Sequence, residues 1–246
     1  MTTVVRAPAK LTVTLRITGV RPDGYHLIDA EMVTLELADL LTFTPADHTT
    51  LTIGGPFGAG LPTDSSNLVA KALTAARRTA AVHIDKQIPA QGGLGGGSAD
   101  AAAALRWAEC TDIATAVEIG ADVPFCLVAP TVGGRARVRG IGEIIDSMPP
   151  VEQVFTLIVP PVGVSTVAAY KAWDALGGPR ADGPNDLEPA ALLVEPSMVR
   201  WRDRIAEAAG RPPTLAGSGS TWFLEGAHRH LADALSDAIV VVTQTA

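Results

Sequence analysis

The chain has 246 residues, of which 47% are hydrophobic and 18% charged, and its formal net charge is −7. This length can bury a large core in one large or two modest domains. The acidic balance argues against a nucleic-acid partner, which requires a basic surface stripe, so an anionic ligand must be held by local cations and backbone dipoles. No secretion signal or apolar run of transmembrane length is visible, which favours a cytoplasmic protein without a membrane partner. Cys110 and Cys126 form no metal motif or disulfide framework, and we expect reduced thiols.

The first part of the chain is expected to be mainly β-structure. Apolar and β-branched residues alternate with a period of two, which predicts strands over 2–18, 30–44 and 51–53. The first segment is either one strand or two strands broken at Pro8, and it carries Lys10, which is either solvated or functional. Pro22-Asp23-Gly24 predicts a turn. Tyr25 and His26 follow this turn, and they either bind a flat ligand or form an ordinary hairpin end.

The most distinctive stretch is a glycine loop that runs into an alanine-rich segment. Five glycines fall within 92–97, and alanines dominate the residues that follow. Glycine permits positive φ whereas alanine favours helix, so the junction predicts a loop feeding a helix N-terminus, with Ser98 or Asp100 near its cap, and a helix end near Glu109. Exposed backbone N–H groups at a helix start form a seat for an anion, most often phosphate. The alternative is a plain turn before an ordinary helix; neither a P-loop nor a Rossmann fingerprint fits the spacing.

Helix and strand signals flank this loop on both sides. Before it, Ser65-Ser66-Asn67 caps a predicted helix that runs to about Ala80, and a strand over 82–88 enters the loop. After it, 111–119 predicts a short helix and 123–128 an apolar strand. Asp122 precedes that strand, and it is either a turn aspartate bonded to its own backbone or a carboxylate that points into a cleft. Arginines then alternate on one face of a strand, which is either solvated or in contact with phosphate; these are Arg135, Arg137 and Arg139.

The C-terminal part predicts a second α+β unit. Pro149-Pro150 is the best candidate for a domain boundary, which divides the chain into 1–149 and 150–246. The elements expected after it are strands over 155–159, 214–223 (with a glycine turn) and 238–243, and helices over 165–175, 199–209 and 228–236, with a further helical stretch that begins at Asn185-Asp186-Leu187-Glu188-Pro189. Their order is that of a ferredoxin-like α+β half.

Several motifs together resemble the GHMP small-molecule kinases, and among them the 4-diphosphocytidyl-2-C-methyl-D-erythritol kinase family. The similar segments are Ala7-Pro8-Ala9-Lys10, Arg21 to His26, Asn67-Leu68, Pro89 to Ala102, Gly120 to Phe125, Gly140 to Glu143, Asn185 to Glu188 and Gly217 to Ser220. The glycine loop is shared by the whole superfamily, whereas Pro-Asp-Gly-Tyr-His and Gly-Ala-Asp-Val-Pro-Phe are specific to this family. The resemblance covers nearly the whole chain.

The resemblance implies a fold and a reaction. The fold would be two-domain α+β, with an N-terminal domain like ribosomal protein S5 domain 2 and a C-terminal ferredoxin-like domain. The reaction would be phosphorylation of the 2-hydroxyl of 4-diphosphocytidyl-2-C-methyl-D-erythritol by ATP, in non-mevalonate isoprenoid precursor synthesis. Asp122 would accept the hydroxyl proton and Lys10 would be its partner. Mg²⁺ would accompany ATP, although the sequence offers no dedicated carboxylate cage and no residue is assigned to a metal.

The resemblance also implies two sets of binding residues and a simple set of partners. ATP would be bound by Pro89, Gly92, Gly93, Leu94, Gly95, Gly96, Gly97, Ser98 and Asn67. The acceptor substrate would be bound by Thr12, Asp23, Tyr25, His26, Thr166, Gly217 and Ser218. The partner would be this small molecule, and the protein a monomer or weak homodimer.

Three departures from the family pattern leave alternatives open. Thr12 stands where family members usually have asparagine, Ser98-Ala99 stands where they usually have two serines, and the segment over 107–117 is shorter than usual. These changes are compatible with a GHMP kinase that acts on another alcohol, or with a nucleotide-binding protein without turnover. The presence of Tyr25 and His26 argues against the first alternative, and that of Lys10 and Asp122 argues against the second.

Overall fold

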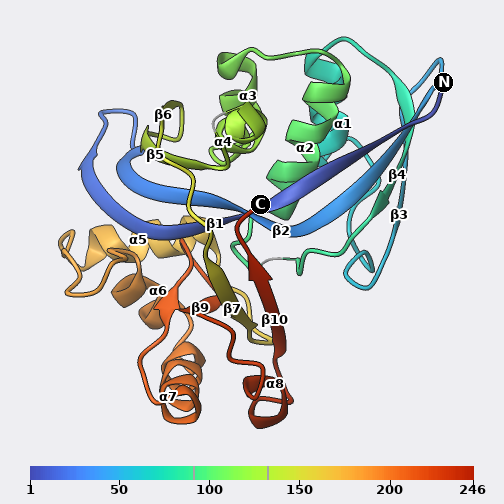
Figure 1. Cartoon of the computed structure of the whole chain (residues 1–246). Coiled ribbons are helices and arrows are strands. Elements are labelled where there is room, and N and C mark those ends of the chain that lie inside the picture. Colours follow the sequence, from blue (N-terminus) through green and yellow to red (C-terminus); the bar gives the residue numbers. More distant parts are fainter. Residues whose placement is uncertain (91, 132) are drawn as a thin grey trace.

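The computed structural model describes residues 1–90, 92–131 and 133–246, and its strands form two sheets (Figure 1). The first is a 6-stranded sheet in the order β3-β4-β2-β5-β6, with β1 paired to β2. Its strands are β1 (Thr3–Val20), β2 (His26–Pro45), β3 (Thr50–Gly54), β4 (Ala80–Asp85), β5 (Arg135–Gly140) and β6 (Ile144–Ser147). The second sheet has the order β10-β7-β9-β8. Its strands are β7 (Val154–Val159), β8 (Thr214–Leu215), β9 (Trp222–Glu225) and β10 (Ile239–Gln244).

The long antiparallel hairpin of β1 and β2 is the frame of the first sheet. The two strands have 18 and 20 residues and are joined through the turn that the sequence predicts before His26. The first strand continues through Pro8 rather than ending there, with a shift of register between Pro8 and Lys10. Proline has no N–H to donate to the ladder, so the strand pairing is locally irregular at this point. Of the two alternatives for this segment, one continuous strand is therefore observed.

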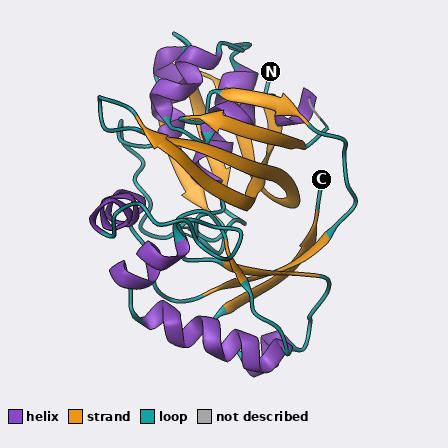
Figure 2. Cartoon of the chain, turned by 90° about the vertical axis from the view of Figure 1, so that its left-hand side faces the viewer, coloured by secondary structure: helices purple, strands orange, loops and turns teal. Residues whose placement is uncertain are grey.

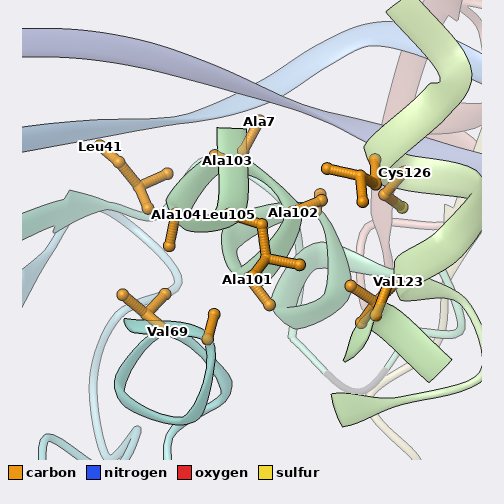
Figure 3. Close-up of a cluster of buried hydrophobic side chains, with 14 of the residues drawn as sticks. Ala7, Leu41, Val69, Ala101, Ala102, Ala103, Ala104, Leu105, Val123 and Cys126 are labelled. Carbon is orange, nitrogen blue, oxygen red and sulfur yellow. The ribbon is translucent and has the colours of Figure 1, made fainter. Parts of the chain in front are cut away.

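Helices cover one face of the first sheet (Figures 1 and 2). They are α1 (Leu68–Ala75), α2 (Gly96–Trp107), α3 (Ile113–Ile119), α4 (Val123–Val128) and the 3₁₀ turn Ala129–Thr131. The alanine-rich α2 is central, and Figure 3 shows Ala101 to Ala104 between the sheet, α1 and α4. Small side chains permit this close approach, and Ala101 to Leu105 are 0% exposed.

Several local predictions need correction. The helix expected over 228–236 covers only Leu231–Ala234, and the strand expected over 82–88 is Ala80–Asp85. Residues 123–128 form the helix α4 rather than a strand, because Pro124 lies at the helix start, where proline is tolerated, and a short apolar run alone does not distinguish the two structures. The first helix ends at Ala75 rather than near Ala80. The cap of α2 is Gly95, with φ of 68°, so Ser98 and Asp100 lie inside the helix.

Helices pack against one face of the second sheet, and the first sheet packs against its other face. Its helices are α5 (Thr166–Ala175), α6 (Glu188–Val194), α7 (Ser197–Ala209) and α8 (Leu231–Ala234). Along β7, Ile158 packs with the helix residues Met198 and Ile205, whereas Phe155 and Leu157 pack with residues of β1 and β2. This alternation follows from the period of two along a strand. The α+β class is therefore as expected.

The domain division remains a proposal. Pro149-Pro150 lies between β6, the last strand of the first sheet, and β7, which belongs to the second. This arrangement supports the division into 1–149 and 150–246. Within the described residues, no helix combines the length and apolar character that a membrane span needs.

The tight packing of α2 yields a stability prediction. Ala103 is 0% exposed in the same cluster as Ala7. Ala103→Leu should lower the free energy of unfolding by roughly 1–3 kcal/mol, because the added atoms force the helix from the sheet. Ala175→Leu, at an exposed position of α5, is the size-matched control and should change stability little. Chemical denaturation of both variants measures the difference, and equal stabilities would contradict the packing argument.

Candidate functional site

Two cavities meet where α2, β1 and the second sheet converge. The first cavity, of about 380 Å³, is lined by the glycine loop, by Asn67 at the start of α1, and by Lys86 and Asp100. The second cavity, of about 650 Å³, lies between the β1–β2 hairpin and α5. Both cavities share Gly93, Ser98 and Asp122. A group bound in one cavity can therefore reach a group bound in the other across Asp122.

The glycine loop is held by backbone bonds to both halves of the molecule. Lys10 N–H in β1 donates to the Leu94 carbonyl over 3.0 Å. Thr221 N–H, from the segment before β9, donates to the Gly92 carbonyl over 3.3 Å. The loop then enters α2 at Gly96, so the N–H groups at the helix start are directed into the first cavity region, where they favour an anion.

Close packing explains two of the loop glycines. A Cβ at Gly93, where φ is +74°, would lie 2.8 Å from the Gly219 carbonyl oxygen. A Cβ at Gly95, where φ is +68°, would lie 2.6 Å from Cγ of Lys10. At Gly97 the nearest atom would be Cδ1 of Leu68, at an ordinary 3.5 Å. Gly93 and Gly95 therefore permit the close docking of the loop, whereas a Cβ at Gly97 would make only an ordinary van der Waals contact.

Lys10 and Asp122 form an ion pair at the meeting point of the cavities. Lys10 Nζ lies 3.2 Å from Asp122 Oδ2, and their side chains are 5% and 34% exposed. Asp122 is the N-cap residue of α4, but its side chain makes no capping bond. Of the two interpretations of Asp122, a carboxylate that points into a cleft describes this geometry.

Thr12 completes a chain of polar contacts with this pair. Lys10 Nζ donates to Thr12 Oγ1 over 3.0 Å, and both residues line the second cavity. The Thr12 hydroxyl thus accepts a hydrogen bond from the lysine ammonium. Behind the pair, burial and the charge of Asp122 raise the pKa of Cys126 to about 12, so this thiol stays neutral.

The far wall of the second cavity is aromatic. The ring of His26 lies with its centroid 4.6 Å from that of Tyr170 and 5.6 Å from that of Trp173. His26 Nε2 is 2.8 Å from Asp174 Oδ1. Tyr25 also lines the cavity and is 59% exposed. Tyr25, His26 and Tyr170 thus line this cavity together.

The structure brings most of the predicted residues to these two cavities. All of the expected ATP residues line the first, and Thr12, Tyr25, His26, Thr166, Gly217 and Ser218 line the second. Thr166 Oγ1 and Ser218 Oγ lie 2.8 Å apart, which joins α5 to the loop before β9. Asp23 is not among the lining residues; its carboxylate binds Arg21 and the backbone N–H of Tyr25 within the turn.

Several lining residues were not found from the sequence. Tyr170 and Asp174 follow Thr166 at intervals of four on α5, so helical periodicity alone could have placed them on one face. Burial raises the pKa of the Tyr170 hydroxyl, which therefore stays protonated. Lys86 and Asp100 gave no signal, because nothing local in the sequence indicates that they meet.

The alternating arginines of β5 each form an ion pair with a carboxylate, which favours a solvated face over contact with phosphate. Arg135 pairs with Glu31 over 2.7 Å, Arg137 with Asp29, and Arg139 with Asp146 over 2.7 Å. None of the three is among the lining residues of either cavity. Within the described residues, no cluster of three or more histidine, cysteine or acidic side chains could hold a metal ion.

Comparisons with known proteins agree with this site. A model of the GHMP kinases N terminal domain matches residues 66–129. The chain is 39% identical over 241 residues to 4-diphosphocytidyl-2-C-methyl-D-erythritol kinase of Jannaschia sp., covering 88% of this chain and 86% of the relative. It is 36% identical over 236 residues to the protein of the same name from Paracoccus denitrificans, covering 88% and 84%. A crystal structure of 4-(cytidine 5'-diphospho)-2C-methyl-D-erythritol kinase matches with a TM-score of 0.75 at 29% identity, over 99% of this chain and 100% of that chain.

The loop glycines predict different changes in the free energy of unfolding at two positions. Gly93→Ala should lower the free energy of unfolding by roughly 1–3 kcal/mol, because the new Cβ meets backbone at positive φ. Gly97→Ala lies in a helix with room for a methyl group and should leave stability equal or raise it by about 0.5–1 kcal/mol. Thermal and urea unfolding measure both, and a destabilised Gly97→Ala beside a stable Gly93→Ala would contradict the docking geometry.

Proposed function

The chain belongs to the 4-diphosphocytidyl-2-C-methyl-D-erythritol kinase family of GHMP kinases, and from this premise we propose which cavity takes each substrate and which residues act. The protein is a kinase that transfers the γ-phosphoryl group of ATP to the 2-hydroxyl of 4-diphosphocytidyl-2-C-methyl-D-erythritol, a step of non-mevalonate isoprenoid precursor synthesis. One observation supports the assignment most: the Lys10–Asp122 pair lies where the two cavities meet.

ATP occupies the first cavity in this proposal. The triphosphate would lie on the backbone N–H groups of the loop at the start of α2, whose dipole favours negative charge. The base and ribose would extend toward Asn67. The Asn67 side chain caps α1 through Val69 N–H and donates to the Pro62 carbonyl, so it would shape this end of the cavity.

The acceptor substrate occupies the second cavity. Its cytosine ring would stack among Tyr25, His26 and Tyr170, since a flat heteroaromatic ring gains most from contact with other rings. The erythritol end would then lie toward Thr12 and Asp122. Thr166 and Ser218, which bridge α5 to the loop before β9, would contact the diphosphate that joins the two ends.

Proton transfer follows from the position of Asp122. As the 2-hydroxyl oxygen attacks the γ-phosphorus, the bond from this phosphorus to the bridging oxygen breaks and ADP leaves, while the O–H bond breaks and Asp122 accepts the proton on a carboxylate oxygen. Lys10, 3.2 Å from Asp122, pairs with this carboxylate and would balance charge on the transferred phosphoryl group. Thr12 holds the lysine ammonium in place through the bond of 3.0 Å.

Mg²⁺ enters as part of the nucleotide complex in this proposal. Mg²⁺ is usually held largely by substrate phosphates and water rather than by a dedicated protein cage. When bound, the ion would neutralise charge on the β- and γ-phosphates. No residue of this chain is assigned to it.

The alternatives are less well supported. Many relatives carry the one kinase name, and Tyr25 and His26 line the second cavity, which favours a cytidine-bearing acceptor over another alcohol. The Lys10–Asp122 pair argues against a protein that binds nucleotide without turnover. Thr12 keeps a hydrogen-bonding contact at the altered position.

The catalytic assignment predicts the effect of two substitutions. Asp122→Asn and Lys10→Ala should each lower kcat by roughly 10²–10⁴-fold, because each removes a group that acts on the transferred proton or phosphoryl group. ADP release with Mg-ATP and 4-diphosphocytidyl-2-C-methyl-D-erythritol, beside a sample without acceptor, measures turnover. Asp237→Asn removes a carboxylate from an exposed ion pair with Arg204 and is the control, expected to keep wild-type turnover. Near-full turnover by Asp122→Asn would rule out its role as proton acceptor.

The aromatic wall predicts a split between the two substrates. Tyr170→Leu should raise KM for the cytidine substrate by about tenfold, because base stacking on an aromatic ring is typically worth 1–3 kcal/mol. KM for ATP should stay within about twofold, since Tyr170 lines only the second cavity of the two. Tyr170→Phe keeps the ring and should restore the wild-type value. An unchanged KM in Tyr170→Leu, or equal changes for both substrates, would remove Tyr170 from the base site.

A further inference from the structure

A buried group of three charges lies behind the glycine loop, on the wall of the first cavity. Lys86 Nζ donates to Asp39 and, over 2.6 Å, to Asp100 Oδ2. The exposed fractions are 4% for Lys86, 0% for Asp39 and 4% for Asp100. The catalytic proposal uses none of these residues. Buried charges are costly unless paired, so this group requires an explanation.

The group ties together both ends of the loop. Asp39 Oδ1 accepts hydrogen bonds from the backbone N–H groups of Gln87 over 2.6 Å and Ile88 over 2.8 Å, where the chain leaves β4. Asp100 lies in the first part of α2, where the loop ends. Lys86 joins the two carboxylates. The charges of these residues therefore act on the geometry and the electrostatics of the loop that we assign to ATP.

The charges of the group do not balance. One ammonium faces two carboxylates, and Oδ1 of Asp100 is buried without a hydrogen-bond partner among the described residues. Burial raises the pKa of Asp100 to about 7, Lys86 opposes this rise, and the charge of Asp39 adds to it. Burial lowers the pKa of Lys86, but the two carboxylates outweigh it and raise that pKa, so the ammonium stays charged. Asp100 Oδ1 is thus the place where a proton relieves the surplus charge.

The neighbouring elements do not change this balance. On α4, the thiol of Cys126 is neutral because burial raises its pKa. Across the cavity, Asp122 and Lys10 pair with each other. Arg106, further along α2, donates to the Cys126 and Arg6 carbonyls. In the described part of the chain, Lys86 is therefore the cation that contacts Asp100.

We propose that Asp100 is a positioning residue of the ATP site that carries a proton on Oδ1 when ATP is bound, so that ATP binding takes up a proton from solvent near neutral pH. This inference rests on the proposed function, because it requires a triphosphate on the loop. An ionised Asp100 behind the loop repels that triphosphate, whereas the protonated form does not. The nucleotide therefore binds more tightly to the protein with the protonated carboxyl group.

The sign of the pH dependence follows from linkage. ATP binding raises the pKa of Asp100 further, so affinity is highest below the pKa of the free protein and falls as the pH rises through it. KM for ATP should rise by about tenfold from pH 6 to pH 9 if binding shifts that pKa by one unit. Asp100→Asn is permanently uncharged and close in shape, so its KM for ATP should stay low and flat over this range. A merely structural role would instead raise KM by the same factor at every pH.

Calorimetry measures the proton directly. Mg-ATP is titrated into the protein at pH 7.5 in two buffers that differ in ionisation enthalpy, and the difference in heat gives the protons taken up. We expect about half a proton per ATP for the wild type and for the Asp237→Asn control, and close to none for Asp100→Asn. The wild-type titration tests the inference even if Asp100→Asn fails to fold.

The outcomes separate this inference from the proposed function. ATP binding without proton uptake by the wild type, or with the same uptake by Asp100→Asn, overturns the role of Asp100 and leaves the kinase assignment intact. Failure of the wild type to turn over the cytidine substrate overturns the proposed function. Uptake that disappears in Asp100→Asn, together with a flattened KM profile, supports the proton-carrying carboxyl group.

Discussion

The site depends on the docking of one glycine loop between two sheets. Leu94 and Gly92 accept backbone hydrogen bonds from β1 and from the segment before β9. The same bonds bring Lys10 beside the loop and Asp122. At Gly93 and Gly95 a side chain would collide with the neighbouring chain. A loop that binds an anion through its backbone must hold its N–H groups in a fixed geometry, and this docking provides the geometry without side-chain donors.

An acidic protein that binds two anionic substrates needs local positive charge at its site. The net charge of −7 supplies no general attraction, so the site relies on the helix start and on single, well-placed lysines. Lys10 and Lys86 are each 4% exposed and each neutralised by carboxylates. In the proposed arrangement, Asp122 faces the reacting groups, whereas Asp39 and Asp100 act from behind the loop. This arrangement relies on local charge balance rather than on total charge.

The sequence predicted much of the fold but not every element. Strands with clear alternation, such as β2 and β7, appeared where expected, and so did the helix capped by Ser165. The run at 123–128 was wrongly predicted as a strand, since six apolar residues fit a buried helix equally well. The motifs led to the Lys10–Asp122 pair and to both cavities. Tyr170 and Asp174 stayed hidden, because the contact of α5 with His26 joins segments far apart in the chain.

The sequence by itself determined the family, the glycine loop before α2 and the residue types of the site, because short motifs with characteristic residue spacing identify these features. Only the tertiary structure decided which charges meet. Lys86, Asp39 and Asp100 are separated by 47 and 14 positions along the chain, yet form one buried group. Lys10 and Thr12, by contrast, lie two positions apart on β1, so the period of two already places both side chains on the same face of the strand. Long-range pairing of buried charges depends on the packing of whole elements, and no local pattern encodes it.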